Sequence, residues 1–165
     1  MKPIRLQRFP GMLIIAAVVV LLDQWAKEWI RAHFVLNESH AFARYFAFTY
    51  VHNTGTAFGL FQGNNKALLW IAAGILCALL YGARGICERG GRWGFIGTAL
   101  VLGGAIGNLI DRWRFGNVID FLDFRVWPVF NIADSCITVG AVCIALSLMT
   151  SSDCDCAGGP VETKR

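Results

Sequence analysis

Charged residues are scarce in this chain, and their scarcity limits the kind of protein it can be. Of its 165 residues, 16% are charged and 56% are hydrophobic, whereas typical soluble domains carry about 25% charged residues. A soluble globule of this size needs more charge to cover its surface, but a membrane protein does not, because its lipid-facing surface is apolar. The net charge of +4 comes from basic residues scattered between apolar runs. That pattern argues against a nucleic-acid partner, which requires one basic face.

The motifs of several hydrolase and metal-binding classes are also missing. No His-Glu-x-x-His is present, so a zinc site at His33, His40 or His52 lacks support. Neither Gly-x-Ser-x-Gly nor the Gly-x-Gly-Asp of one class of intramembrane protease occurs. Cys154 and Cys156 form a lone Cys-x-Cys in a polar tail, which is a weak signal for a disulfide or a metal. From these residues, a zinc peptidase and a serine hydrolase therefore both lack support.

Four apolar runs are long enough to cross a bilayer as helices, which takes about 20 residues each. The basic residues before the first run suggest a signal peptide, but no small-residue cleavage site follows, so we interpret it as a retained anchor. We predict a mainly α, integral membrane fold with four transmembrane helices in one domain over residues 1–165. The predicted helices lie at about residues 12–31, 66–83, 93–110 and 129–149, and a tail covers 150–165.

The distribution of basic residues predicts the orientation. Basic groups lie before the first span, between spans two and three, and in the tail, which places both termini in the cytoplasm, although the bias over the opposite loops is slight. Segments 42–61 and 111–127 then face outward. The first is rich in Phe, Tyr, Thr and Val, and it predicts a strand pair that turns at residues 53–55. A small extracytoplasmic β-sheet and a short outward loop would lie on the membrane surface.

Charged side chains in two of the spans need an explanation, because each costs roughly 2.5–3.5 kcal/mol at the centre of a membrane helix. Asp23 and Lys27 are four residues apart, so they share a helix face and can pair. A solvated helix end in the headgroup layer is the alternative. Asn108, Asp111 and Arg112 also share a face at the end of the third span. A helix cap with a surface ion pair is the alternative there.

Two further acidic residues suggest hydrolytic chemistry. Asp134 has apolar neighbours and follows Asn131 on the same face of the fourth span, where Pro128 is suited to a helix start. Asp120 lies in an apolar segment just before that span. Two carboxyl groups brought together share one proton, so one can take a proton from water while the other donates one to a carbonyl oxygen. From spacing alone this pairing is a hypothesis, and Asp123 is either a competing candidate or a surface charge.

Five motifs together resemble the lipoprotein signal peptidase (signal peptidase II) family. They occur in the family's order through most of the chain, which makes the resemblance specific. The matching stretches are Asp-Gln-Trp-Ala-Lys at 23–27, Asn-Thr-Gly-Thr-Ala-Phe-Gly at 53–59, Gly-Ala-Ile-Gly-Asn-Leu-Ile-Asp-Arg at 104–112, Val-Ile-Asp-Phe at 118–121 and Phe-Asn-Ile-Ala-Asp at 130–134.

The resemblance implies an aspartic endopeptidase of the bacterial inner membrane, active at the extracytoplasmic face without metal or cofactor. Its substrate would be a diacylglyceryl-modified prolipoprotein, cut before the lipidated cysteine of the lipobox, and membrane lipids would surround a monomer. Asp120 and Asp134 would be the catalytic pair. The residues that bind substrate or support the site would be Asp23, Lys27, Asn53, Gly104, Asn108, Asp111, Arg112 and Asn131.

Two readings without catalysis remain open from the residues alone. A small oligomeric transporter would use Asp23, Asp111 and Asp134 as a proton or cation path. A structural membrane subunit would tolerate Asn at these positions with little effect. Cleavage of a lipidated peptide by purified protein separates both from a peptidase.

Overall fold

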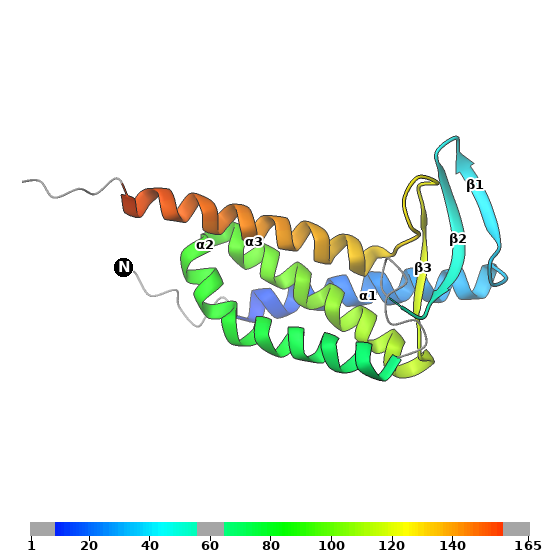
Figure 1. Ribbon diagram of the computed structural model, residues 1–165, viewed down its shortest axis with the longest axis horizontal. Helices are drawn as coiled ribbons and strands as arrows, with labels where there is room; N and C mark the ends of the chain where they lie inside the picture. Colours follow the sequence, from blue (N-terminus) through cyan, green and yellow to red (C-terminus); the bar gives the residue numbers. More distant parts are fainter. Residues whose placement is uncertain (1–8, 56–64, 157–165) are drawn as a thin grey trace, which may run out of the picture.

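A bundle of long helices carries a small sheet at one end (Figure 1). The computed structural model describes residues 9–55 and 65–156, with the backbone alone for Phe9 and residues 151–156. The helices are α1 (Phe9–His33), α2 (Asn65–Phe115) and α3 (Ile132–Cys156). The strands are β1 (Ser39–Ala43), β2 (Phe46–Asn53) and β3 (Val118–Asp123). A mainly helical chain with a small sheet is therefore confirmed.

Helix α2 consists of two arms that meet at a sharp reversal. Gly91 has φ 55° and ψ −135° there, a conformation open to glycine because it has no Cβ. The arms fold back on each other, and a Cβ on Gly94 would lie 2.7 Å from the Ile86 carbonyl oxygen. The bundle thus has four helical rods: α1, the two arms of α2, and α3 (Figure 1).

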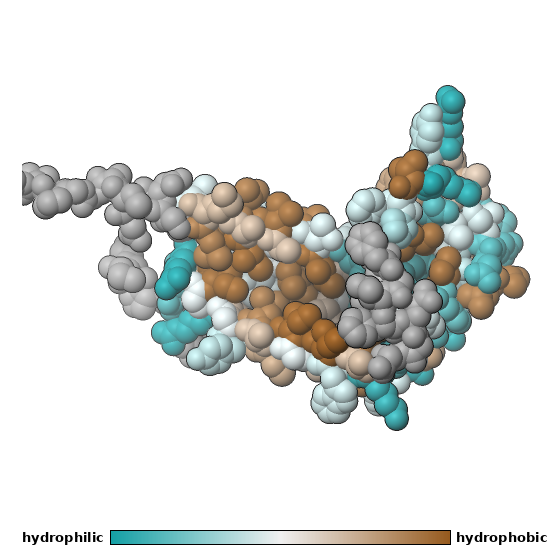
Figure 2. Space-filling view, viewed as in Figure 1, coloured by the Kyte–Doolittle hydropathy of each residue, from teal (hydrophilic) through white to brown (hydrophobic). Residues whose placement is uncertain are grey.

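Large apolar side chains cover the outside of the rods while charged side chains are buried between them, which is unlike a soluble protein. Leu13, Trp70 and Tyr81 are 61%, 75% and 94% exposed, while Asp23 and Lys27 are almost completely buried. Figure 2 shows hydrophobic residues covering the visible face of the rods. Within the described residues, α2 and the Ile132–Thr150 part of α3 are long and apolar enough to cross a membrane.

The sheet is antiparallel with the order β1-β2-β3, and it corrects two expectations. The hairpin turns at Arg44 and Tyr45, not at residues 53–55. Asn53 ends β2 instead, and its side-chain oxygen accepts a hydrogen bond from the Gly55 amide at 3.0 Å. This Asx turn leads the chain away from the sheet. Residues 56–61 of the predicted strand segment lie outside the described residues.

The segment 111–127, predicted as an outward loop, contributes the last turn of α2 and the third strand. Beyond it, Phe130 forms a β-bridge with Leu122 through two backbone hydrogen bonds of 2.8 and 3.1 Å. This bridge holds the chain outside the helix until Asn131. Pro128 therefore does not start the last helix, and α3 begins at Ile132.

Two apolar clusters join the parts together. Met12, Ala16, Ala99 and Leu102 pack α1 against the second arm of α2. Nearer the sheet, a second cluster joins the end of α1 to β2 and β3 through Ile30, Tyr50, Ile119 and Phe121. The polar interior lies at this end of the bundle.

Candidate active site

The N-terminus of α3 places Asp134 in the polar interior. Asn131 precedes the helix, and its Oδ1 accepts a hydrogen bond from the Asp134 amide at 2.8 Å. In return, the backbone N–H of Asn131 donates to Asp134 Oδ2 at 3.4 Å, which completes a capping box. The Ala133 amide donates to Asp23 Oδ1 at 2.9 Å. The side chains that satisfy the free amides of the helix start thus also fix Asp134.

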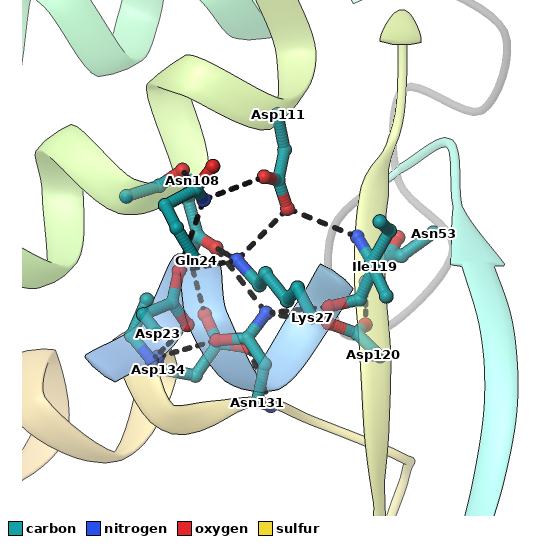
Figure 3. A network of polar contacts seen from close by, with 12 residues as sticks. Asp23, Gln24, Lys27, Asn53, Asn108, Asp111, Ile119, Asp120, Asn131 and Asp134 are labelled. Atoms are coloured by element: carbon teal, nitrogen blue, oxygen red, sulfur yellow. Dashed lines mark hydrogen bonds and ion pairs between the residues drawn. The ribbon is translucent and has the colours of Figure 1, made fainter. Parts of the chain in front are cut away.

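Asp120 approaches from the sheet and is linked to Asp134 by the same asparagine. It is 1% exposed on β3, and its Oδ1 accepts a hydrogen bond from Asn131 Nδ2 at 2.6 Å. Asn53 Nδ2 donates to its Oδ2 at 2.8 Å. Asp134 Oδ1 accepts a hydrogen bond from Asn108 Nδ2 at 2.7 Å. Figure 3 shows Asp120 on β3 and Asp134 at the start of α3, with Asn131 between them.

Burial sets the protonation state of Asp120. It removes water from the carboxylate and, together with the nearby charge of Asp134, raises the pKa of Asp120 from 3.8 to about 7. The amides of Asn53 and Asn131 favour the ionised form and lower this pKa, but by less. Near neutral pH, Asp120 therefore exists in both protonated and ionised forms, as a group that exchanges protons with a substrate requires.

Lys27 orders the polar residues behind the two carboxyl groups. Its Nζ lies 2.8 Å from both Asp23 Oδ2 and Asp111 Oδ2, and it donates to Asn108 Oδ1 at 3.0 Å. Because Lys27 binds the oxygen of the Asn108 amide, the nitrogen points at Asp134. Lys27 is 1% exposed. The alternative of a solvated helix end for Asp23 and Lys27 is therefore wrong.

Asp111 and Arg112 have different roles despite being adjacent. Asp111 is buried, binds Lys27 and accepts a hydrogen bond from the Ile119 amide at 3.2 Å, so a surface ion pair is wrong for it. Arg112 is half-buried, and its Nη2 donates to the Gly55 carbonyl oxygen at 3.4 Å. Gly104 is a packing residue, because a Cβ there would lie 2.4 Å from the Ala133 carbonyl oxygen.

Gln24 completes the site and was not predicted from the sequence. Its Nε2 donates to Asp111 Oδ1 at 2.8 Å and to the Gly107 carbonyl oxygen at 3.2 Å. The available signal was spacing, because Gln24 and Lys27 are three residues apart and so lie on one helix face. Asp123, the competing acid, binds the Thr49 hydroxyl at 2.8 Å and does not reach Asp134 or Asn131 through any hydrogen bond.

Both acids line an open pocket of about 840 Å³. Its polar part comes mainly from the predicted site, and its apolar part comes mainly from the β3–α3 loop and from α3. The polar lining residues are Asn53, Asn108, Arg112, Asp120, Asp134, Ser135 and Thr138, and the apolar ones include Phe124, Val126, Trp127, Pro128, Val129, Phe130, Ile137 and Val139. Acid–base groups beside an apolar wall suit hydrolysis within a substrate that has a large apolar part.

Comparisons with known proteins point in the same direction. The family model for signal peptidase II matches residues 15–150. The chain is 42% identical over 146 residues to a lipoprotein signal peptidase of Moorella thermoacetica, covering 83% of this chain and 91% of that one. It is 44% identical over 137 residues to the lipoprotein signal peptidase of a Nostoc species, with coverage of 81% and 86%.

Solved structures show the same fold. One bacterial membrane enzyme superposes with a TM-score of 0.82 at 29% identity, covering 94% of this chain and 96% of the other. A second superposes with a TM-score of 0.76 at 31% identity, covering 86% and 94%.

Proposed function

Because this chain belongs to the signal peptidase II family, the aspartic peptidases that cleave signal peptides from prolipoproteins, we propose that Asp120 and Asp134 are its catalytic pair. One observation carries the proposal. The two carboxyl groups reach the same pocket from β3 and α3, and Asn131 contacts both, at 2.6 Å from Asp120 and 3.4 Å from Asp134.

The mechanism follows from the different surroundings of the two acids. Asp120, with its pKa near 7, begins protonated and donates to the oxygen of the scissile carbonyl. Asp134 begins ionised and takes a proton from the attacking water. The tetrahedral intermediate then breaks as the nitrogen of the leaving peptide accepts the proton from Asp134 and the C–N bond breaks, while Asp120 takes back the proton from one hydroxyl group as the carbonyl reforms. Asn108 and Asn131 hold Asp134 through hydrogen bonds, and Asn53 and Arg112 line the pocket where the substrate peptide lies.

The substrate in this proposal is a diacylglyceryl-modified prolipoprotein, cut before the lipidated cysteine of its lipobox. Two features of the pocket support it. An apolar wall lies beside the acid pair, as a lipid-bearing substrate requires. The pocket also lies where the helices meet the sheet, at the end of the apolar rods, so acyl chains can remain in lipid while the peptide reaches the carboxyl groups (Figure 1).

We also propose that the four rods are four transmembrane helices of one domain in the bacterial inner membrane. The sheet would lie at the extracytoplasmic face and both termini in the cytoplasm. Exposed tryptophans near the sheet support a position of this end of the rods at the membrane–water interface, because tryptophan is enriched there. They occur on the C-terminal half of α1, in the first turns of α2, in its last turn and in the β3–α3 loop: Trp25, Trp29, Trp70, Trp113 and Trp127.

Family membership excludes the transporter and structural-subunit readings. In addition, Asp23 and Asp111 both bind Lys27 instead of lining an open path, which suits a supporting role. We further propose that the enzyme acts as a monomer, since both carboxyl groups and their hydrogen-bond partners come from one chain.

Cleavage of a synthetic diacylglyceryl prolipoprotein peptide by purified protein tests the catalytic pair, with the product followed by gel shift. Asp120→Asn and Asp134→Asn should each lower kcat by a factor on the order of 10³ or more. Catalytic residues that act as a unit lose most of their effect when one member is removed. Thermal unfolding checks that both variants remain folded. Glu88→Gln is the matched control, since Glu88 is an exposed acid that pairs with Arg84. Near-normal turnover in either Asp variant would contradict the proposed catalytic pair.

A further inference from the structure

The loop between β3 and α3 forms an apolar wall of the pocket although it has little regular structure. It supplies Phe124 and residues 126–130 to the lining. Val126 and Trp127 are nonetheless 86% and 61% exposed, so burial does little to hold them. Phe124 is attached at one end, where its ring packs on Phe46 at 5.1 Å and stacks on Phe130 at 5.7 Å. The β-bridge between Phe130 and Leu122 holds the other end, so the residues between these two ends require another anchor.

A closed ring of hydrogen bonds supplies that anchor, and we name its four members, Ser39, Thr49, Asp123 and Arg125, the clasp. The guanidinium of Arg125 donates to Ser39 Oγ at 3.1 Å, and Ser39 Oγ lies 2.8 Å from Thr49 Oγ1. Thr49 Oγ1 donates to Asp123 Oδ2 at 2.8 Å. The Arg125 amide closes the ring on Asp123 Oδ1 at 2.7 Å. One residue comes from each strand and the fourth from the loop.

The donors in the clasp have a consistent direction. Thr49 uses its hydroxyl hydrogen on Asp123, so the hydroxyl of Ser39 must donate to Thr49 and accept from Arg125. Each bond thus polarises the next, from a cation to a carboxylate, which strengthens the chain of bonds. Because the ring is closed, loss of any one hydroxyl opens it.

Backbone geometry shows that the clasp also imposes a conformation on the loop. Arg125 has φ 64°, in the left-handed region that residues with a Cβ avoid. Such a conformation persists where surrounding contacts determine it. Those contacts are the two hydrogen bonds from Arg125 to Asp123 and Ser39, together with an ion pair of 3.7 Å between Arg125 Nε and Asp123 Oδ2. They direct the chain into Val126 and Trp127, which line the pocket.

We propose that Ser39, Thr49, Asp123 and Arg125 are positioning residues that fix the apolar wall and thereby set the affinity for the prolipoprotein. None of the four lines the pocket, so they act through the loop and not on the reacting atoms. The wall meets the apolar part of the substrate, while the acid pair performs the hydrolysis. This inference rests on the proposed function, because the affinity in question is that of the peptidase for its substrate.

Kinetics on the purified full-length chain test the clasp, with the same diacylglyceryl peptide over a range of concentrations. Thr49→Val keeps the shape of the side chain but removes the hydroxyl, so KM should rise about tenfold, while kcat stays within about twofold of wild type. Thr49→Ser retains a hydroxyl and should restore KM. Ser39→Ala opens the same ring at an exposed position, so its KM should match that of Thr49→Val. The double variant should be no worse than either single one.

Hydrogen exchange measured by mass spectrometry supplies a second readout. Amides of residues 124–127 and of Val129 should exchange faster in Thr49→Val and Ser39→Ala, while the helices keep wild-type exchange and the thermal midpoint is unchanged. Unchanged KM, or a loss confined to kcat, would overturn the proposal, as would unchanged exchange in the loop. If the wild type failed to cut the peptide, the proposed function would fail, whereas the exchange comparison would still decide whether the clasp holds the wall.

Discussion

Burial beside a second acid raises the pKa of the Asp120 carboxyl group. Its raised pKa of about 7 means that the carboxyl group holds its proton below neutral pH and loses it above. We therefore predict that kcat/KM falls as pH rises through about 7, because both acids are then ionised and no proton remains to donate. A flat profile from acid to strongly alkaline pH would contradict the shared proton. The measurement is kcat/KM against pH with the lipidated peptide.

Asn53 offers a way to move that pH profile. Its amide donates to Asp120 and stabilises the ionised form, which lowers the pKa of Asp120. Asn53→Ala removes this hydrogen bond, so the alkaline limb of kcat/KM should shift to higher pH, whatever the change in maximum rate. A shift to lower pH would show that Asn53 does not act on Asp120 in this way.

Lys27 is the residue whose loss should affect stability most. Lys27→Ala leaves Asp23 and Asp111 buried without their cation, at a cost of about 3–5 kcal/mol. Thermal unfolding in detergent should show this loss, with Lys66→Ala, an exposed lysine on α2, as the control. Activity should fall less than in Asp120→Asn, because Lys27 contacts Asn108 and not the substrate. Complete inactivity at normal stability would instead require a direct catalytic role.

At the scale of the elements, the distance between α2 and α3 positions Asn108 against Asp134. Gly104 permits that distance, because a Cβ there would meet the Ala133 carbonyl oxygen at 2.4 Å. Gly104→Ala should therefore separate the helices, lower the thermal midpoint and reduce kcat. Gly74→Ala is the matched control: no atom lies within 4 Å of its added Cβ, and alanine favours helices. Equal effects of the two substitutions would show that close packing at Gly104 is unimportant.

Elements differ in how far their sequences predict them. Hydropathy suffices for long apolar helices, since the periodic signal is local. The sheet was harder to predict, because the role of Asn53 depends on a contact with Asp120, which is 67 residues away in the sequence. The start of α3 was misplaced for a similar reason, since Phe130 is held by Leu122 on β3. Pairing with a neighbouring strand overrode the local preference of Pro128 for a helix start.

The candidate site shows the same limit. Charged residues inside apolar segments marked Asp23, Lys27, Asp111 and Asp134 as needing partners, because unpaired charges are costly there. Spacing could not supply the partners across helices. Lys27 proved to bind Asp111 as well as Asp23, and Gln24 entered the site through a hydrogen bond to Asp111.

For the whole molecule, the distribution of apolar and charged side chains suits a membrane. The apolar exterior of the rods (Figure 2) favours lipid, while the buried charged residues gather at the end that carries the sheet. A carboxyl pair at that end is shielded by protein on one side and open to water through the pocket on the other. This arrangement allows burial to raise the pKa of Asp120 without denying the site the water that hydrolysis consumes.

The proposed topology makes a prediction about access from the two sides of the membrane. A protease-recognition site inserted between Arg44 and Tyr45 extends an exposed hairpin turn, so the variant should fold and cleave substrate normally. Protease added outside spheroplasts should cut this site but spare a C-terminal epitope tag, because the sheet faces outward and the C-terminus lies inside. In inverted membrane vesicles the result should reverse. Cutting of the tag in intact spheroplasts would contradict four membrane crossings with cytoplasmic termini, because an even number of crossings returns the chain to the side on which it began.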